Sequence, residues 1–214
     1  MRKSLLLLTG LLLGFAFACG GGSHSAPATA GPTQATGLAY TDPSGTGWRL
    51  VKDPVSTPDH LVLNLVGPSG LKSRGAGFNL MAPAGVRFRR FDETGFPLRD
   101  GGVYTLLDTD PTGDPLEPVL LAGGVKSGNM LTVAVFQKDR RATAKDSGST
   151  LFQIGLDFDS TAGLHAGESL LLTVVKAKYM AEDIGTFSPY PTYEMIAKAH
   201  LVDMDLAVGS LSAQ

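Results

Sequence analysis

The chain has 214 residues, of which 43% are hydrophobic, and its 18 basic and 20 acidic side chains give a formal net charge of −2. This composition provides enough apolar material for one substantial core, so a single domain is the natural division of the length. A mildly acidic chain with no concentrated basic segment is a poor candidate for nucleic-acid binding, and we exclude that class of partner.

The first 18 residues have the layout of a secretory signal peptide. Arg2 and Lys3 precede an uncharged run from Leu5 to Ala18 that ends in small residues. A helix needs roughly 20 apolar residues to cross a bilayer core, and this run is shorter. Residues 1–18 are therefore predicted to be a targeting segment and not a membrane span.

Residues 19–37 begin with Cys19, the only cysteine of the chain, and continue with glycine, serine, alanine, proline and threonine. The segment has almost no large apolar side chain, so it cannot bury enough surface to offset its ordering entropy. We predict a flexible tether that precedes one domain over residues 38–214. A lone cysteine in an exported chain has no disulfide partner and needs another explanation.

From Leu38 onward the hydrophobic period is two, which indicates β-strands. In the clearest run Leu61, Leu63 and Leu65 share one face, and Asn64 lies on the other. The last run is expected to turn Val202, Met204, Leu206 and Val208 inward. Strands are predicted within residues 47–53, 60–68, 76–83, 85–91, 102–108, 118–124, 130–138, 151–158, 169–180 and 200–211.

The fold class follows from these runs and from the turns between them. Only residues 192–200 could form a short helical turn, whereas 27 glycines and 13 prolines punctuate the chain. Many short alternating strands with turn signals predict an all-β protein, either a sandwich or a barrel. We favour a β-sandwich of eight to ten strands, because each strong strand has one apolar and one mixed face.

The run at residues 86–91 interleaves Arg87, Arg89 and Arg90 with phenylalanines. Basic and aromatic residues in alternation can bind nucleic acid or anionic sugars. On an acidic domain, the simpler interpretation is an exposed edge strand whose charges discourage aggregation.

A loop at residues 108–119 resembles part of a calcium-binding loop. Asp108, Asp110 and Gly113 match its first, third and sixth positions, but Val119 stands where a bidentate glutamate is needed. Asp108, Asp110 and Asp114 are thus a candidate calcium site, and an acidic surface loop is the favoured alternative.

Aromatic residues spaced by prolines occur at residues 187–193. Tyr190 and Tyr193 could form a stacking platform for a sugar, together with Trp48, the only tryptophan. The same rings could instead be buried as a lid over one end of the sandwich. Trp48 itself stands in a predicted strand, where core packing is the expected role.

The sequence offers no catalytic constellation. The four histidines are far apart and form no pair at metal-ligand spacing, and no serine lies in a G-x-S-x-G turn. The glycine-rich stretches at residues 75–81 and 123–129 lack the order of a dinucleotide or phosphate loop. We predict a protein that is not an enzyme and that has no cofactor.

Two resemblances add to this interpretation. "FAFAC", residues 15–19, resembles the cleavage box of bacterial lipoproteins, in which the cysteine carries acyl chains. That resemblance implies lipidation of Cys19 and a place in the cell envelope, with outer-membrane sorting suggested by the glycine at position 20. Ala16 and Phe17 depart from the usual box and also suit ordinary signal peptidase, which leaves simple secretion as the alternative.

The second resemblance spans residues 57–211. "HLVLNLVGPSGLKSRGAGFNLMAPAGVRF", the later "GNMLTVAVFQK" and "LFQIGLDFDSTAGLHAGES" follow the order of strands and loops in cohesin-type domains. Cohesins and related carbohydrate-binding modules are jelly-roll β-sandwiches, so the resemblance implies that architecture. No binding residue of the family can be placed on a numbered position here.

Together these observations predict a lipid-anchored, non-catalytic module on a bacterial envelope surface that binds or assembles with another protein. The alternatives are a carbohydrate-binding lipoprotein and a structural subunit of a surface assembly. The partner, a protein or a polysaccharide, is not identified by the sequence.

Overall fold

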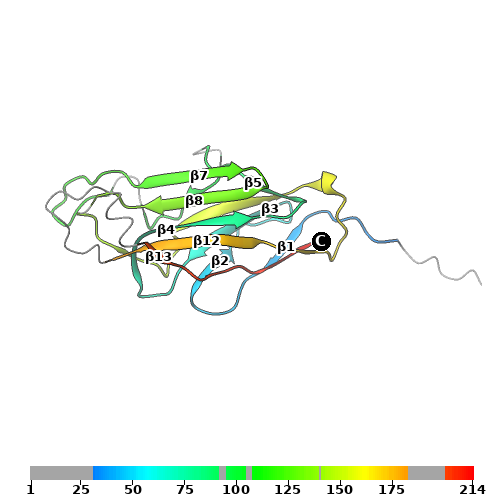
Figure 1. The fold of residues 1–214 in the computed structure, drawn as a ribbon, viewed down its shortest axis with the longest axis horizontal. Coiled ribbons are helices and arrows are strands. Elements are labelled where there is room, and N and C mark those ends of the chain that lie inside the picture. Colours follow the sequence, from blue (N-terminus) through cyan, green and yellow to red (C-terminus); the bar gives the residue numbers. More distant parts are fainter. Residues whose placement is uncertain (1–30, 92–94, 105–107, 140, 183–200) are drawn as a thin grey trace, which may run out of the picture. The chain divides into compact units, whose positions relative to one another are not determined.

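The computed structural model describes residues 31–91, 95–104, 108–139, 141–182 and 201–214. Within the unit Pro32–Gln214 these residues form fifteen strands, arranged as two six-stranded sheets and one three-stranded sheet (Figure 1). The helical structure found among the described residues is one short 3₁₀ turn at Ser160–Ala162. The predicted all-β sandwich is therefore confirmed, and no described helix is long and apolar enough to span a bilayer.

The front sheet, as we call it, has the strand order β13-β12-β4-β8-β7, and the short strand β9 also pairs with β4. All of its pairs are antiparallel. Its strands are β4 (Lys72–Met81), β7 (Leu120–Lys126), β8 (Met130–Phe136), β9 (Lys145–Asp146), β12 (Thr173–Ala181) and β13 (Leu201–Asp203).

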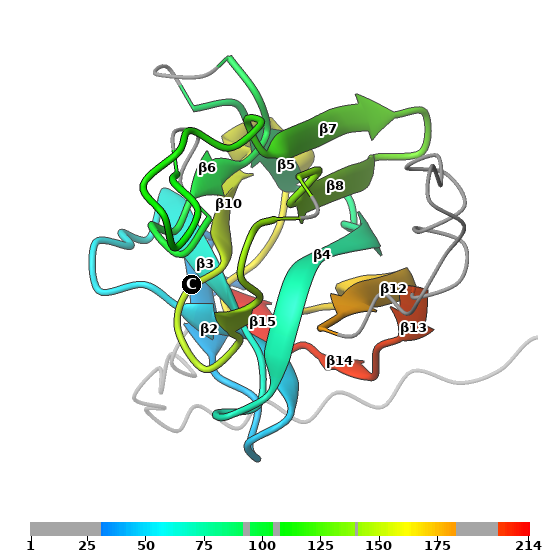
Figure 2. The same ribbon diagram turned by 90° about the vertical axis from the view of Figure 1, so that its left-hand side faces the viewer.

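The back sheet has the order β14-β2-β3-β10-β5, and β6 also pairs with β10. Only β14 and β2 run parallel. Its strands are β2 (Trp48–Lys52), β3 (His60–Val66), β5 (Val86–Arg89), β6 (Arg99–Asp100), β10 (Phe152–Phe158) and β14 (Leu206–Ala207). Figure 2 shows the two sheets as separate layers, with β3 and β10 in one and β4 and β8 in the other.

Alternation along the strands builds the core between the sheets. Leu61, Leu63 and Leu65 of β3 are fully buried and belong to one hydrophobic cluster with the inward residues of β4 and β8. Phe78 of β4 and Phe152 of β10 stack across the core with ring centroids 5.6 Å apart and planes at 18°. Burial of apolar area on this scale is the main stabilising contribution to such a sandwich.

The outer face of β3 departs from the prediction. Asn64, expected on a mixed and solvated face, is only 9% exposed. Its amide donates to Asp53 over 2.9 Å, and its carbonyl oxygen accepts from Gln153 over 2.7 Å. Gln153 also donates to Asp53, so three polar groups satisfy one another over the strand.

The third sheet joins the two ends of the ordered unit. β1 (Leu38–Thr41) pairs antiparallel with β15 (Ser210–Ala213), which also pairs with β11 (Ser169–Leu170). Residues 33–37 extend this arrangement, since the Ala35 amide donates to the Leu164 carbonyl and Gly37 exchanges hydrogen bonds with Gln214. Residues 33–37 therefore belong with the strands of the compact unit Pro32–Gln214.

Three predicted strands are wrong in detail. Residues 200–211 do not form one strand, because β13, β14 and β15 belong to three different sheets. Met204 and Leu206 do turn inward, but Val202 is 41% exposed. The run 169–180 is divided into β11 and β12, and the described residues of 102–108 form no strand. The predicted helical turn at 192–200 lies outside the described residues.

Candidate functional site

The outward surface of the front sheet, which we call the front face, has rows of small residues across three adjacent strands. Ala122 of β7 lies opposite Ala134 of β8, and Ala134 lies opposite Gly77 of β4. Paired residues in an antiparallel sheet point to the same side, so these three positions form one continuous row. Gly77 and Ala134 have small side chains or none, whereas Phe136, Lys176 and Lys178 beside them are large. The surface is therefore depressed at Gly77 and Ala134.

Two glycines of β4 are required for this packing. A Cβ atom at Gly77 would lie 2.6 Å from the Ala134 Cβ and 2.8 Å from the Val133 carbonyl oxygen. At Gly75 the backbone φ is +144°, and a Cβ atom would lie 2.4 Å from the ring of Phe136. The Phe136 ring therefore covers Gly75 and forms one wall of the depression.

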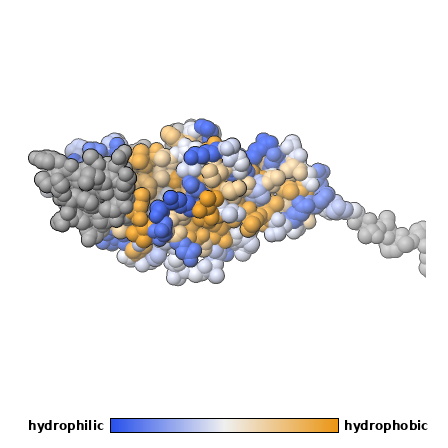
Figure 3. Space-filling model, in the orientation of Figure 1, coloured by the Kyte–Doolittle hydropathy of each residue, from blue (hydrophilic) through white to orange (hydrophobic). Residues whose placement is uncertain are grey.

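The depression is a shallow hollow of about 180 Å³. Figure 3, in the orientation of Figure 1, shows apolar surface over this part of the molecule with hydrophilic side chains beside it. The residues with side chains or backbone at its wall and floor include Gly77, Asn79, Thr132, Ala134, Phe136, Lys176, Lys178 and Leu201.

Lysines of β12 supply positive charge at the hollow. Lys178 Nζ lies 2.6 Å from Asp203 Oδ1 on β13, and this hydrogen bond lowers the pKa of Asp203. Lys176 is exposed and has no ion pair within the described part of the chain. The wall therefore presents one cation in contact with Asp203 and a second, Lys176, that acts on the same carboxylate only from a longer distance.

A polar atom without a partner also lies at the hollow. The Thr132 hydroxyl oxygen is buried and has no hydrogen-bond partner among the described residues. Such a group costs free energy unless something supplies the missing bond. Thr132 lines the hollow, but its hydroxyl oxygen is covered by the protein itself.

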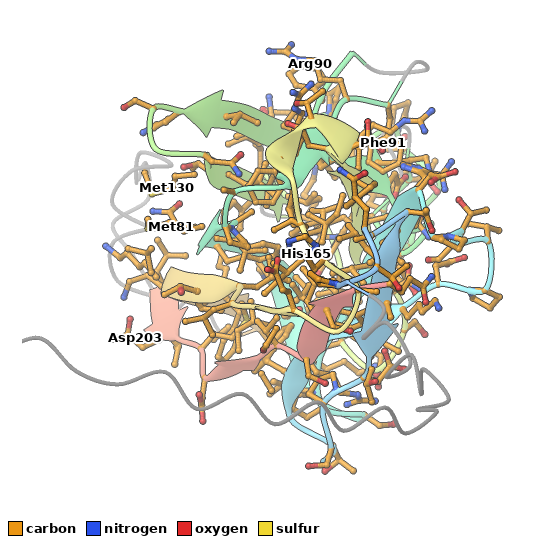
Figure 4. The ribbon with its side chains drawn as sticks, turned by 90° about the vertical axis from the view of Figure 1, so that its right-hand side faces the viewer. Met81, Arg90, Phe91, Met130, His165 and Asp203 are labelled. Carbon is orange, nitrogen blue, oxygen red and sulfur yellow. The ribbon has the colours of Figure 1, made fainter. Side chains whose placement is uncertain are left out.

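Two methionines extend the apolar surface along the same face. Met81 of β4 is 41% exposed and lies opposite Met130 of β8. Figure 4 shows these two residues and Asp203 along one side of the domain. Methionine side chains are flexible and polarizable, and they adapt to the shape of a contacting surface.

The structure places Trp48 in the core and not on a binding surface. Its side chain is 6% exposed, and its ring packs against Tyr179 with centroids 5.2 Å apart. A stacking platform for sugar needs an accessible ring face, so the ligand-binding prediction for Trp48 is corrected. Tyr190, Tyr193 and Cys19 lie outside the described residues.

Two carboxylates of the candidate calcium loop, those of Asp108 and Asp110, already have partners in the protein. Asp108 Oδ2 lies 2.7 Å from Lys145 Nζ, and Asp110 Oδ2 lies 3.3 Å from Arg141 Nη1. The other oxygen of Asp110 accepts hydrogen bonds from Thr112 and from the Asp114 amide. Within the described ranges no group of three metal-ligating side chains is gathered, so the arrangement is that of an acidic loop held by its own cations.

Arg141 also pairs with Asp139, which gives a pH-dependent prediction. The hydrogen bond from Arg141 lowers the pKa of Asp139 to about 2. An unperturbed aspartate titrates near 3.9, so the stabilisation is complete above that pH and is lost as the pH falls toward 2. In urea unfolding, the wild type should exceed Asp139→Asn in stability at pH 6, and the difference should shrink at pH 2.5. A difference that stays constant between these values would contradict the assignment.

The arginine-rich strand is an edge strand, as predicted. β5 is the terminal strand of the back sheet, and Arg87 lies 2.5 Å from Asp159. Phe91, which follows the strand, is buried at 4% exposure.

Among the pairs of titratable groups that the sequence did not indicate is one between His60 and Asp157. His60 Nδ1 lies 2.5 Å from Asp157 Oδ1, because β3 and β10 place the two residues opposite each other. They are far apart in the chain, and only the strand register brings them together. No signal in the sequence marks this pair.

No protein-family model matches the chain, and no curated protein matches it. Similar solved structures are cohesin modules. One is a non-cellulosomal cohesin from the archaeon Archaeoglobus fulgidus, with 10% identity and a TM-score of 0.43 over 78% of this chain and 88% of that one.

Two more come from cohesin–dockerin complexes. The sixth cohesin of scaffoldin B from Acetivibrio cellulolyticus has 13% identity and a TM-score of 0.44, covering 77% of this chain and 96% of that one. The OlpC cohesin from Clostridium thermocellum has 8% identity and a TM-score of 0.44, covering 79% of this chain and 94% of that one. These likenesses concern the fold.

Proposed function

We propose that this domain is a non-catalytic protein-binding module and that the front face is its binding surface. One observation carries the proposal: the small residues Gly77 and Ala134, opposite each other on β4 and β8, leave a hollow in the front face. A central depression bordered by apolar and charged side chains suits a projecting anchor residue of a partner.

The charge at the hollow indicates the chemistry of that partner. Lys176 has no ion pair within the described residues, whereas Lys178 is paired with Asp203. A carboxylate beside the partner's apolar anchor would complement Lys176 and speed association at low salt. The partner is therefore proposed to present an apolar residue next to an acidic one.

The test is capture of envelope proteins on the purified chain, comparing wild type with Lys176→Glu. A partner held by the hollow should be retained by the wild type at low salt and retained several-fold less by the variant. Lys52→Glu, which makes the same charge change on the back sheet, is the matched control. Equal loss in both variants, or no loss in either, would contradict the proposed role of Lys176.

We further propose that the module is exported and anchored to a bacterial membrane through acyl chains on Cys19. The signal-like residues 1–18 and the position of the only cysteine directly after them support this. Two or three acyl chains hold a protein durably at a membrane, whereas one chain does so only marginally.

The anchor is tested by mass spectrometry of the mature N-terminus from the native host. The expected result is a chain that begins at Cys19 and carries the mass of a diacylglyceryl group, with or without a further acyl chain. An unmodified Cys19, or a mature chain that begins elsewhere, would contradict the lipid anchor. The protein would then be an ordinary secreted protein.

A further inference from the structure

The edge strands of the two sheets are protected unequally. β13 and β14 have three and two residues, and β5 carries Arg87 and Arg89. β7 has seven residues, Leu120–Lys126, without proline and with one charge at its last position. An edge strand is usually protected from pairing with another chain by being short or by carrying charged side chains. β7 is long and has only one charge, so it has little protection.

The outer edge of β7 pairs with none of the strands that the structure describes, and Figure 1 shows β7 as the outermost strand of its sheet. Leu120 is 37% exposed and Val125 is 41% exposed. The strand thus offers unpaired backbone groups together with exposed apolar side chains, which is a template for strand addition.

The register with β8 fixes which way each side chain of β7 points. Leu121, Gly123 and Val125 lie opposite the buried residues of β8 and face inward, and the even-numbered positions face outward. Residues opposed in an antiparallel pair point to the same side, so a second β7 must match even positions with even ones. A two-fold axis through Gly123 meets this condition and uses all seven residues.

The side chains are complementary in that register. Leu121 lies opposite Val125 of the second copy, which joins two apolar groups. Ala122 lies opposite Gly124, which joins two small ones. Lys126 lies opposite Leu120, so the two ammonium groups are at opposite ends of the pair and do not repel each other.

We propose that two copies of this chain associate through antiparallel pairing of β7 about Gly123. The two front sheets then form one continuous sheet, and both hollows open on the same side. An isologous two-fold contact is the commonest arrangement of soluble oligomers. This association does not depend on the proposed partner binding.

Sedimentation equilibrium of the full chain tests the proposal. The wild type should show a concentration-dependent mass of two chains. Val125→Lys places a charge against Leu121 of the second copy and should raise the dissociation constant by about tenfold or more. Val202→Lys on β13 is the matched control, because Val202 is also 41% exposed but lies at the opposite edge of the same sheet. A monomeric wild type, or equal dissociation of both variants, would overturn the proposal.

Cysteine cross-linking checks the register independently of the stability of the Val125 variant. In a Cys19→Ala background, Ala122→Cys with Gly124→Cys should give a covalent dimer on oxidation, with peptides linked between positions 122 and 124. A Cβ atom at Gly124 meets nothing within 4 Å, so the substitution fits. Opposed residues of a strand pair lie within the Cα separation that disulfides accept. Absence of the dimer, or linkage to a different protein, would overturn the proposal.

Discussion

Replacing Phe152 by alanine is expected to lower the free energy of unfolding by about 3–5 kcal/mol. The side chain is fully buried, and its ring stacks on Phe78 of the opposite sheet. The substitution removes apolar area from the core and leaves a cavity between the two sheets. The sheets cannot move closer to fill the cavity without breaking other contacts. No substitution on the surface should approach this effect.

The measurement is urea unfolding followed by circular dichroism, with the midpoint and slope fitted for each variant. Val55→Ala is the control, since Val55 is 63% exposed and its change should stay within about 0.5 kcal/mol. A loss below about 1 kcal/mol for Phe152→Ala would mean that the two sheets do not share this contact.

Ala134→Arg is expected to weaken partner binding by about 100-fold or more, which corresponds to about 2.7 kcal/mol. Ala134 is in the middle strand of the row of small residues, between Ala122 and Gly77. An arginine side chain at this point would occupy most of the hollow of about 180 Å³ and exclude an anchor residue. The position faces outward, so the fold should be kept.

The affinity of the captured partner is measured by titration calorimetry against wild type and variant. Val55→Arg adds the same side chain at an exposed position outside the hollow and should leave the affinity unchanged. Thermal unfolding of both variants confirms that the fold is retained. Equal affinity of Ala134→Arg and wild type would place the binding surface elsewhere on the domain.

The strands could largely be predicted because alternation is a local signal. Runs such as 60–66 and 152–158 place apolar residues at every second position, and the structure forms β3 and β10 there. The run 200–211 shows the limit of that signal. Its alternation is as regular, yet its three strands enter three sheets, because partners far along the chain decide the pairing.

The candidate site could not be predicted from the sequence. Gly77, Ala122 and Ala134 are ordinary small residues in three separate runs, and nothing in those runs says that they share one row. The register of β4 with β8 and β12 creates the hollow. For Trp48 the sequence left a sugar platform as a candidate beside the expected core role, and its burial against Tyr179 decides for the core.

The sequence by itself determined the class of the protein: period-two runs separated by glycine and proline, with no long run of helical period to supply another layer, indicate an all-β domain in which strands bury their apolar faces against one another. It also determined the signal-like N-terminus and the isolated position of Cys19. The tertiary structure decided which strands are neighbours, and therefore where the hollow lies and which edge is left open. That information depends on long-range register, since side chains on different strands meet only after the sheets have formed.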